Sequence, residues 1–201
     1  MKNIEVEIRG PLDDTSYSSL VEHVKNNGSK TSTQERLFFD LSQTIGINNR
    51  TLDVRLKVTN GNVQIVVKKG EAGSVSREEA EVKVEAAGLK DALHALALLG
   101  YPKGVYGDRK IERYMVGDIE FAIQDVINIS DGTLHSRFYE AEVMATVETK
   151  EREEEKLREA LTKLRLPVFD NEEWNVYEAT INKEANGWFD YSSTDVSRFI
   201  N

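Results

Sequence analysis

Ile4-Glu5-Val6-Glu7-Ile8-Arg9 alternates aliphatic and charged residues close to the start of the chain. In a β-strand, successive side chains point to opposite faces, so Glu5, Glu7 and Arg9 share one face and the aliphatic residues share the other. The stretch therefore predicts a strand that presents two carboxylates and a guanidinium group together.

The same alternation recurs in three later stretches. They are Leu52-Asp53-Val54-Arg55-Leu56-Lys57-Val58, Val63-Gln64-Ile65-Val66-Val67-Lys68 and Tyr139-Glu140-Ala141-Glu142-Val143. One alternating strand is typical of an antiparallel sheet with one face in water. A merely soluble face mixes the two signs of charge, whereas here the outer stretches carry glutamate pairs and the middle ones are basic in net effect. This segregation favours a sheet that closes around its polar side.

The two kinds of charge suit different groups of one ligand. Hard divalent cations take carboxylate oxygens, and arginine and lysine arrays take phosphate oxygens. A site with both is suited to a metal-bound polyphosphate.

Turn and helix signals divide the rest of the chain. We predict a helix over 15–27, a polar loop at 29–33, a hairpin turn at 60–62, a loop at 69–74, a strand over 77–85, a helix over 88–100, a strand around 119–123, a turn at 128–133, a helix over 148–164 and a short helix ending at residue 200. The Asn60-Gly61-Asn62 turn makes the Arg55 and Lys68 strands neighbours. Aromatic residues between Trp174 and Tyr191 favour packing against the barrel over base stacking.

Composition excludes several classes. The 201 residues suit one domain, with a core over 1–145 and residues 146–201 completing the barrel. There is no cysteine, which excludes disulfides and thiolate metal sites, and the three histidines show no zinc spacing. A formal net charge of −9 argues against a nucleic-acid partner. No apolar run is long enough to span a membrane, so we expect a cytoplasmic protein.

The ordered series of motifs resembles a known family. Glu5-x-Glu7-x-Arg9 is similar to the ExExK signature of the CYTH superfamily, the triphosphate tunnel metalloenzymes, which includes class IV adenylate cyclases, thiamine triphosphatases and inorganic triphosphatases. Further pieces follow in the family's order over residues 1–145: Arg36-Leu37-Phe38-Phe39-Asp40, Arg55-x-Lys57, Lys68-Lys69-Gly70, Arg77-x-Glu79-x-Glu81, the basic stretch 109–114, and Glu140-x-Glu142.

The chain departs from the family's pattern at several positions. Arg9 replaces the signature lysine, and it keeps the charge but stays protonated and cannot transfer a proton. Phe38 stands where a tyrosine is usual, which argues against thiamine triphosphate as the substrate. Two alignments stay open: the family's aspartate before the last glutamate pair falls at Gln124 or Asp125, and any of Arg109, Lys110 and Arg113 can face the site.

The resemblance implies an α+β fold: a closed or nearly closed antiparallel barrel of about eight strands with helices packed outside. It implies a triphosphatase that uses Mg²⁺ or Mn²⁺, acting on inorganic or nucleoside triphosphate; the alternatives are a class IV adenylate cyclase and a binding module without turnover. The partner is a small-molecule triphosphate, and a homodimer stays possible. The implied metal ligands are Glu5, Glu7, Glu140 and Glu142, with Glu5, Glu7 and Arg9 as catalytic residues. The implied substrate-binding residues are Arg9, Arg55, Lys57, Lys68, Arg77, Arg109 and Arg113.

Overall fold

The computed structural model describes residues 4–42, 52–70 and 76–199. Along these residues the elements are β1 (Ile4–Pro11), α1 (Asp14–Asn27), β2 (Ser29–Asp40), β3 (Leu52–Thr59), β4 (Asn62–Lys69), β5 (Ser76–Val84), α2 (Leu89–Leu98), β6 (Lys103–Val116), β7 (Ile119–Ile127), β8 (Leu134–Ala145), α3 (Lys150–Lys163), α4 (Asn171–Glu184) and β9 (Gly187–Asp190). Short 3₁₀ helices lie at Ala86–Gly88 and Val196–Phe199.

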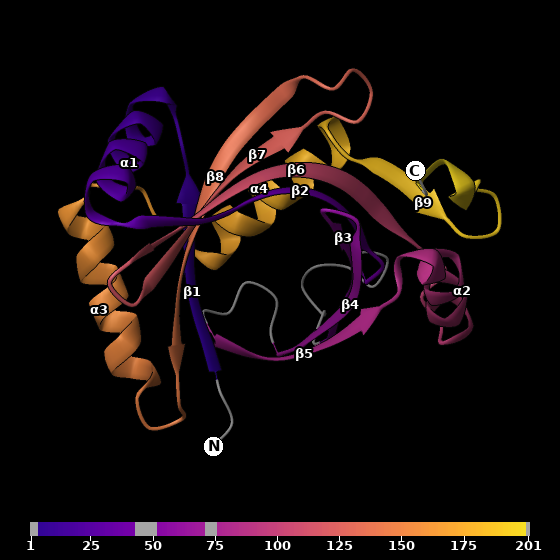
Figure 1. Ribbon diagram of the computed structural model, residues 1–201, viewed down its shortest axis with the longest axis horizontal. Helices are drawn as coiled ribbons and strands as arrows, with labels where there is room; N and C mark the ends of the chain where they lie inside the picture. Colours follow the sequence, from indigo (N-terminus) through magenta and orange to yellow (C-terminus); the bar gives the residue numbers. More distant parts are fainter. Residues whose placement is uncertain (1–3, 43–51, 71–75, 200–201) are drawn as a thin grey trace.

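The strands form one antiparallel sheet that closes on itself (Figure 1). Their order is β2-β3-β4-β5-β1-β8-β7-β6, and β2 also pairs with β6, which completes a ring of eight strands. The ninth strand, β9, pairs with the first residues of β6, Lys103 to Tyr106. This arrangement confirms the α+β fold class and the antiparallel eight-stranded barrel predicted from the alternating sequence.

The aliphatic residues of the alternating strands pack against helices outside the ring. Helices α1 and α3 lie on one side of the molecule and α2 on the opposite side (Figure 1). Val6 and Ile8 of β1 are buried with Leu20 of α1 and Leu157 of α3 in one core. A second core lies under α2. Because the aliphatic residues face outward, the charged residues of the same strands face the inside of the ring.

The turn between β3 and β4 has the predicted form. Asn60 and Gly61 have positive φ angles of 48° and 78°, as a type I′ hairpin requires, and the side chain of Asn60 bonds to the backbone of β2. The turn places Asp53 opposite Lys68 and Lys57 opposite Gln64, so the two basic strands are neighbours as predicted.

The predicted polar loop at 29–33 was wrong, because these residues begin β2. The backbone from Ser29 to Thr33 pairs with residues 112–115 of β6, with a register irregularity between Lys30 and Ser32. Backbone pairing to a long neighbouring strand compensates for the lack of apolar side chains in this stretch. The predicted loop at 69–74 falls largely outside the described residues.

The C-terminal segment contains a helix that sequence analysis left unassigned. Asp170 and Glu173 form a capping box at the start of α4, in which each side chain accepts a hydrogen bond from the other's backbone N–H. Trp174, Ile181 and Phe138 of β8 belong to a third apolar core, so α4 packs on the barrel as the aromatic residues indicated.

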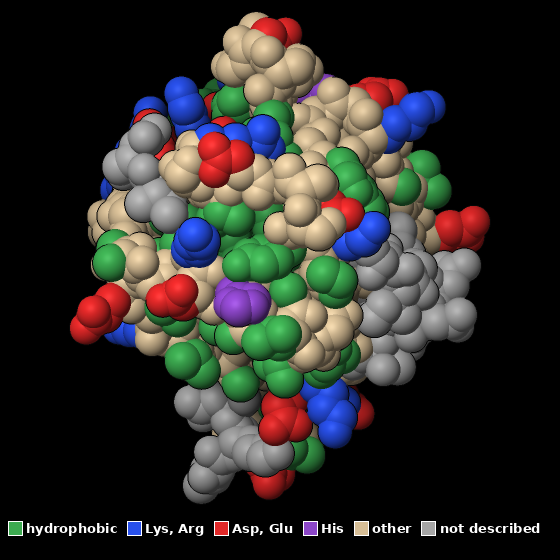
Figure 2. All heavy atoms as spheres, turned by 90° about the vertical axis from the view of Figure 1, so that its right-hand side faces the viewer, with side chains coloured by type: hydrophobic (Ala, Val, Ile, Leu, Met, Phe, Trp, Pro, Cys, Tyr) green, Lys and Arg blue, Asp and Glu red, His purple; other side chains and the backbone are tan. Residues whose placement is uncertain are grey.

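The face that carries α2 and β9 shows a gathering of apolar side chains (Figure 2). Leu98 and Leu99 at the end of α2 and Trp188 of β9 are among the exposed large hydrophobic residues. No helix in the described ranges is long and apolar enough to cross a membrane.

Candidate functional site

A cavity of about 290 Å³ lies inside the ring of strands, near the lower end of the size range of small-molecule sites. It is lined by every site residue predicted from the sequence: Glu5, Glu7, Arg9, Arg55, Lys57, Lys68, Arg77, Arg109, Arg113, Glu140 and Glu142. Six strands therefore bring together predicted residues that lie up to 137 positions apart in the sequence.

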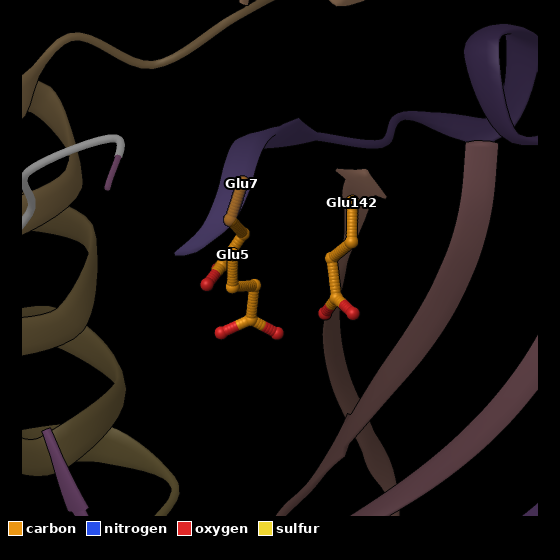
Figure 3. Close-up of side chains that lie close together, drawn as sticks. All are labelled: Glu5, Glu7 and Glu142. Atoms are coloured by element: carbon orange, nitrogen blue, oxygen red, sulfur yellow. The ribbon is translucent and has the colours of Figure 1, made fainter. Parts of the chain in front are cut away.

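Three carboxylates converge on one side of the cavity. Glu7 of β1 lies directly opposite Glu142 of β8, and Glu5 is two residues before Glu7 on the same face. One oxygen of each of Glu5, Glu7 and Glu142 lies within 4.8 Å of the others (Figure 3). We call these three residues the acidic cluster. Glu140, the fourth predicted ligand, lies outside it, pairs in register with Arg9, and accepts a hydrogen bond from Gln124.

The charges around the acidic cluster are unevenly balanced. Burial alone raises the pKa of Glu7, but Arg9, Lys68 and Arg77 outweigh it and lower the pKa to about 2. Burial and the neighbouring carboxylates raise the pKa of Glu142 well above its ordinary value. A buried glutamate surrounded by like charges indicates a site with too little positive charge for its carboxylates, which a bound cation would supply.

Two basic residues are held by the acidic cluster itself. The Lys68 ammonium group lies 2.9 Å from Glu5, 3.7 Å from Glu7 and 2.6 Å from Glu79. Arg113 lies 3.5 Å from Glu142 and also donates to Glu120. These ion pairs position both cations next to the candidate metal ligands.

Two further arginines of the cavity lining are held by a buried aspartate that lies behind them. Asp53 is only 1% exposed. Its carboxylate accepts two hydrogen bonds from Arg55, at 2.9 and 2.8 Å, and one from Arg77 at 3.1 Å. Arg55 also lies 3.6 Å from Asp40. A bidentate carboxylate fixes the plane of a guanidinium group, so Asp53 orients Arg55, while its single hydrogen bond from Arg77 holds that residue beside it.

Three other cations lining the cavity form no ion pair with any carboxylate among the described residues. Arg36 donates only to the neutral side chains of Thr59 and Gln34, and burial and Arg113 lower its pKa. Burial, Arg36 and Lys68 lower the pKa of Lys57 to about 8.

The third, Arg109, donates to the backbone of Asp108 and to Asn186, and its guanidinium carbon lies 4.7 Å from the centre of the Phe38 ring. Burial lowers its pKa to about 10. Buried or partly buried cations without a carboxylate partner are unfavourable in an empty cavity, so Arg109, Arg36 and Lys57 indicate where an anion would bind.

The structure shows which of the residues left open by the sequence line the cavity. Arg109 and Arg113 line the cavity, whereas Lys110 is exposed. Gln124 lines the cavity, whereas Asp125 pairs with Arg137 outside the lining. Of these two neighbours, the side chain that faces the cavity is therefore a neutral amide.

Helix α4 supplies cavity residues that sequence analysis missed, namely Trp174, Glu178, Ile181 and Asn182. Their spacing of three and four residues places them along one side of the helix. The Arg9 guanidinium carbon lies 4.3 Å from the centre of the Trp174 ring, and Glu178 lies 3.9 Å from Arg55. The capping box Asp170-x-x-Glu173 was the available sequence signal for this helix. Arg36 was also missed, although Arg36 and Phe38 alternate on one face of a strand.

Comparisons with known proteins identify the fold. No family model and no curated protein matches the sequence. Among solved structures, the PH1819 protein of Pyrococcus horikoshii OT3 is similar with a TM-score of 0.66 and 19% identity, over 87% of this chain and 99% of that one.

Two other similar structures have functional names. The "putative adenylate cyclase" of Vibrio parahaemolyticus matches with a TM-score of 0.62 and 16% identity, over 83% of this chain and 91% of that one. The "putative adenylyl cyclase HpAC1" of Hippeastrum, described as having a dominant triphosphatase activity, matches with a TM-score of 0.52 and 15% identity, over 98% of this chain and 94% of that one. At these identities the likeness concerns the fold alone. The chain therefore shares the fold of these structures, which agrees with the fold implied by the resemblance of its sequence motifs to the triphosphate tunnel metalloenzymes.

Proposed function

We propose that this protein is a metal-dependent phosphohydrolase that acts on a triphosphate, either inorganic or nucleoside triphosphate, bound in the cavity. The observation that carries the proposal is the presence, in one cavity, of the acidic cluster and of cations without a carboxylate partner among the described residues. The first suits a divalent metal ion and the second suits phosphate oxygens. A small-molecule triphosphate is therefore the partner we propose, and not a nucleic acid.

The donor set favours Mg²⁺ or Mn²⁺. Glu5, Glu7 and Glu142 offer only carboxylate oxygens, which hard cations prefer, and no histidine lines the cavity. The raised pKa of Glu142 also fits a metal site, because a bound cation would favour its ionised form. When bound, such an ion would neutralise phosphate charge and help to align the attacking group.

The protein's own task in phosphoryl transfer is mostly positioning and neutralisation of charge. Arg55 and Arg77, oriented by Asp53, would donate to phosphate oxygens, and Arg36 and Lys57 would bind a further part of the polyanion. Glu7 and the other carboxylates beside Arg9 raise the pKa of its guanidinium group above an already high value. Arg9 therefore stays protonated and would bind and orient the substrate without accepting a proton.

Class IV adenylate cyclase activity is the second candidate. The similarity to the putative adenylate cyclase of Vibrio parahaemolyticus favours it, and the same cavity would bind the triphosphate of ATP. A cyclase needs in addition a place for adenine and for activation of the ribose 3′-hydroxyl group.

Phosphorus NMR of the products tests the proposal. The protein is incubated separately with tripolyphosphate and with ATP, in the presence of Mg²⁺ or Mn²⁺. Orthophosphate release supports the triphosphatase, whereas cyclic AMP with pyrophosphate supports the cyclase. Unchanged substrate that nevertheless binds in a calorimetric titration identifies a binding module and contradicts catalysis.

A further inference from the structure

Helix α4 brings a carboxylate into the basic part of the cavity. Glu178 lies in the middle of the helix, its side chain is 13% exposed, and its carboxylate oxygen is 3.9 Å from the guanidinium group of Arg55. It lines the cavity between Trp174 and Asn182, one helical turn away in each direction. The buried apolar contacts of Trp174 and Ile181 with the barrel fix this side of the helix against the cavity.

The negative charge of Glu178 acts on arginines from three strands. Glu178 lies 3.9 Å from Arg55 on β3, and its charge also attracts the guanidinium groups of Arg9 on β1 and Arg109 on β6, which line the same cavity. We call Arg9, Arg55 and Arg109 the helix-side arginines. Each lines the cavity, and each was predicted to bind substrate phosphate.

The basic lining nearer the β3–β4 hairpin contains no helix-borne carboxylate among the described residues. The carboxylates that act there come from strands of the barrel: Glu79 acts on Lys57, and Glu140 and Glu142 act on Arg36. Lys57 and Arg36 lie toward the β3–β4 hairpin: Lys57 is two residues before Thr59, the last residue of β3, and Arg36 donates to the side chain of Thr59. Glu178 is not among the charged groups with the largest effects on the pKa of Arg36 or Lys57. The cavity therefore offers two basic regions, and only one of them already contains the helix-borne carboxylate.

We propose that Glu178 is a specificity-determining residue, whose carboxylate competes with phosphate for the helix-side arginines and thereby restricts where a polyanion binds in the cavity. This inference rests on the proposed triphosphate-binding function and deepens it. Carboxylate and phosphate oxygens accept the same hydrogen bonds from guanidinium groups. A phosphate group among the helix-side arginines would also be repelled by Glu178. Near Arg36 and Lys57, by contrast, Glu79 is already paired with Lys68 and Glu142 with Arg113.

Consequently, the phosphates of a bound ligand should lie preferentially toward the β3–β4 hairpin. A short anion can avoid Glu178, whereas a longer one must extend into the region that Glu178 occupies. The cost imposed by Glu178 should therefore grow with the number of phosphate groups.

Calorimetric titration of the full chain with tripolyphosphate and with pyrophosphate tests this inference. Glu178→Gln keeps the shape of the side chain and removes its charge. We expect this variant to bind tripolyphosphate about tenfold more tightly than the parent, equivalent to about 1.4 kcal/mol, with a smaller gain for pyrophosphate. Glu184→Gln is the matched control: it removes one carboxylate from the same helix, and Glu184 does not line the cavity.

Each outcome has a distinct meaning. Weaker binding by Glu178→Gln would show that Glu178 orients the arginines, and equal binding would show that its charge does not matter; either result overturns the inference and leaves the proposed function standing. An equal gain with Glu184→Gln, or an equal gain for both anions, would reduce the effect to net charge and also overturn it. Failure of both the parent and Glu178→Gln to bind tripolyphosphate, with and without Mg²⁺, would contradict the proposed function as well.

Discussion

Replacement of Glu142 by glutamine should stabilise the metal-free protein while weakening its affinity for metal. Glu142 is a largely buried carboxylate of the acidic cluster, and its pKa is raised because burial and neighbouring carboxylates disfavour its charged form. Glu142→Gln retains the size and hydrogen-bonding groups of the side chain and removes the disfavoured charge. If Glu142 serves to bind metal, its charge should reduce the stability of the metal-free protein.

Distances in the cluster give the magnitude. With an effective dielectric constant of about 20, unit charges 4.8 Å apart repel by about 3.5 kcal/mol, which applies to Glu142 with each of Glu5 and Glu7. Arg113 at 3.5 Å attracts Glu142 by about 5 kcal/mol on the same basis. The net repulsion is about 2 kcal/mol before burial is counted. We expect the variant to gain about 1–2 kcal/mol, or about 2–4 °C in Tm for each kcal/mol.

The gain should depend on pH in a defined direction. Because the folded-state pKa of Glu142 is raised above 4.5, the parent loses stability as the pH rises through that folded-state pKa. Glu142→Gln does not lose stability in this way, because glutamine does not ionise. Urea denaturation in EDTA should therefore show a larger advantage of Glu142→Gln at pH 7.5 than at pH 5, and added Mn²⁺ should reverse the order by stabilising the parent more.

Glu155→Gln provides the control, because Glu155 is an exposed carboxylate on α3 and its replacement should leave the stability nearly unchanged. If Glu142→Gln were clearly less stable than the parent in EDTA at pH 7.5, the carboxylates would be adequately neutralised without metal, and the reasoning would be refuted.

Two further predictions concern the cations of the cavity. Asp53→Asn should destabilise the fold by about 3 kcal/mol in urea denaturation, because it removes the buried carboxylate that is bidentate to Arg55 and hydrogen-bonded to Arg77, whereas the exposed Asp118→Asn should have little effect; an equal loss in both variants would contradict this role of Asp53. Because the pKa of Lys57 is lowered to about 8, its positive charge is lost as the pH rises through 8. The parent should therefore bind tripolyphosphate more tightly than Lys57→Met at pH 7, and this advantage should decrease at pH 9, as measured by calorimetry without metal. A constant advantage would show that the Lys57 ammonium group does not contact the anion.

The alternating strands carried most of the information about the site. On β1, charge and aliphatic character alternate without exception, so the inward face was predicted correctly. On β6 the same reasoning could not show which face is inward. Arg109 and Lys110 are adjacent cations, so they point to opposite faces of the strand. The inward face there also contains Ile111, which is buried, and the outward face contains Tyr114, which packs in the core under α1. Because polar and apolar residues occur on both faces of β6, the alternation that identifies the inward face is lost.

Other features depend on tertiary contacts that no local pattern encodes. The start of β2 is polar on both faces and is a strand only because β6 pairs with it. No local pattern shows that Lys68 is buried among three carboxylates or that Arg55 is bound by Asp53. Because both residues belong to ion-pair networks, their removal affects stability as well as binding. Arg36, which was not predicted, is a cleaner probe of binding.

The most direct test of the central claim is the metal dependence of tripolyphosphate hydrolysis, followed by phosphorus NMR in the parent, Glu7→Gln and Glu155→Gln. If the acidic cluster and the cations together form the site, the parent and Glu155→Gln will release orthophosphate with Mn²⁺ or Mg²⁺, EDTA will abolish the release without unfolding the protein, and Glu7→Gln will be at least about 100-fold slower. Hydrolysis that persists after exhaustive chelation, or that proceeds equally well in Glu7→Gln, would contradict the account.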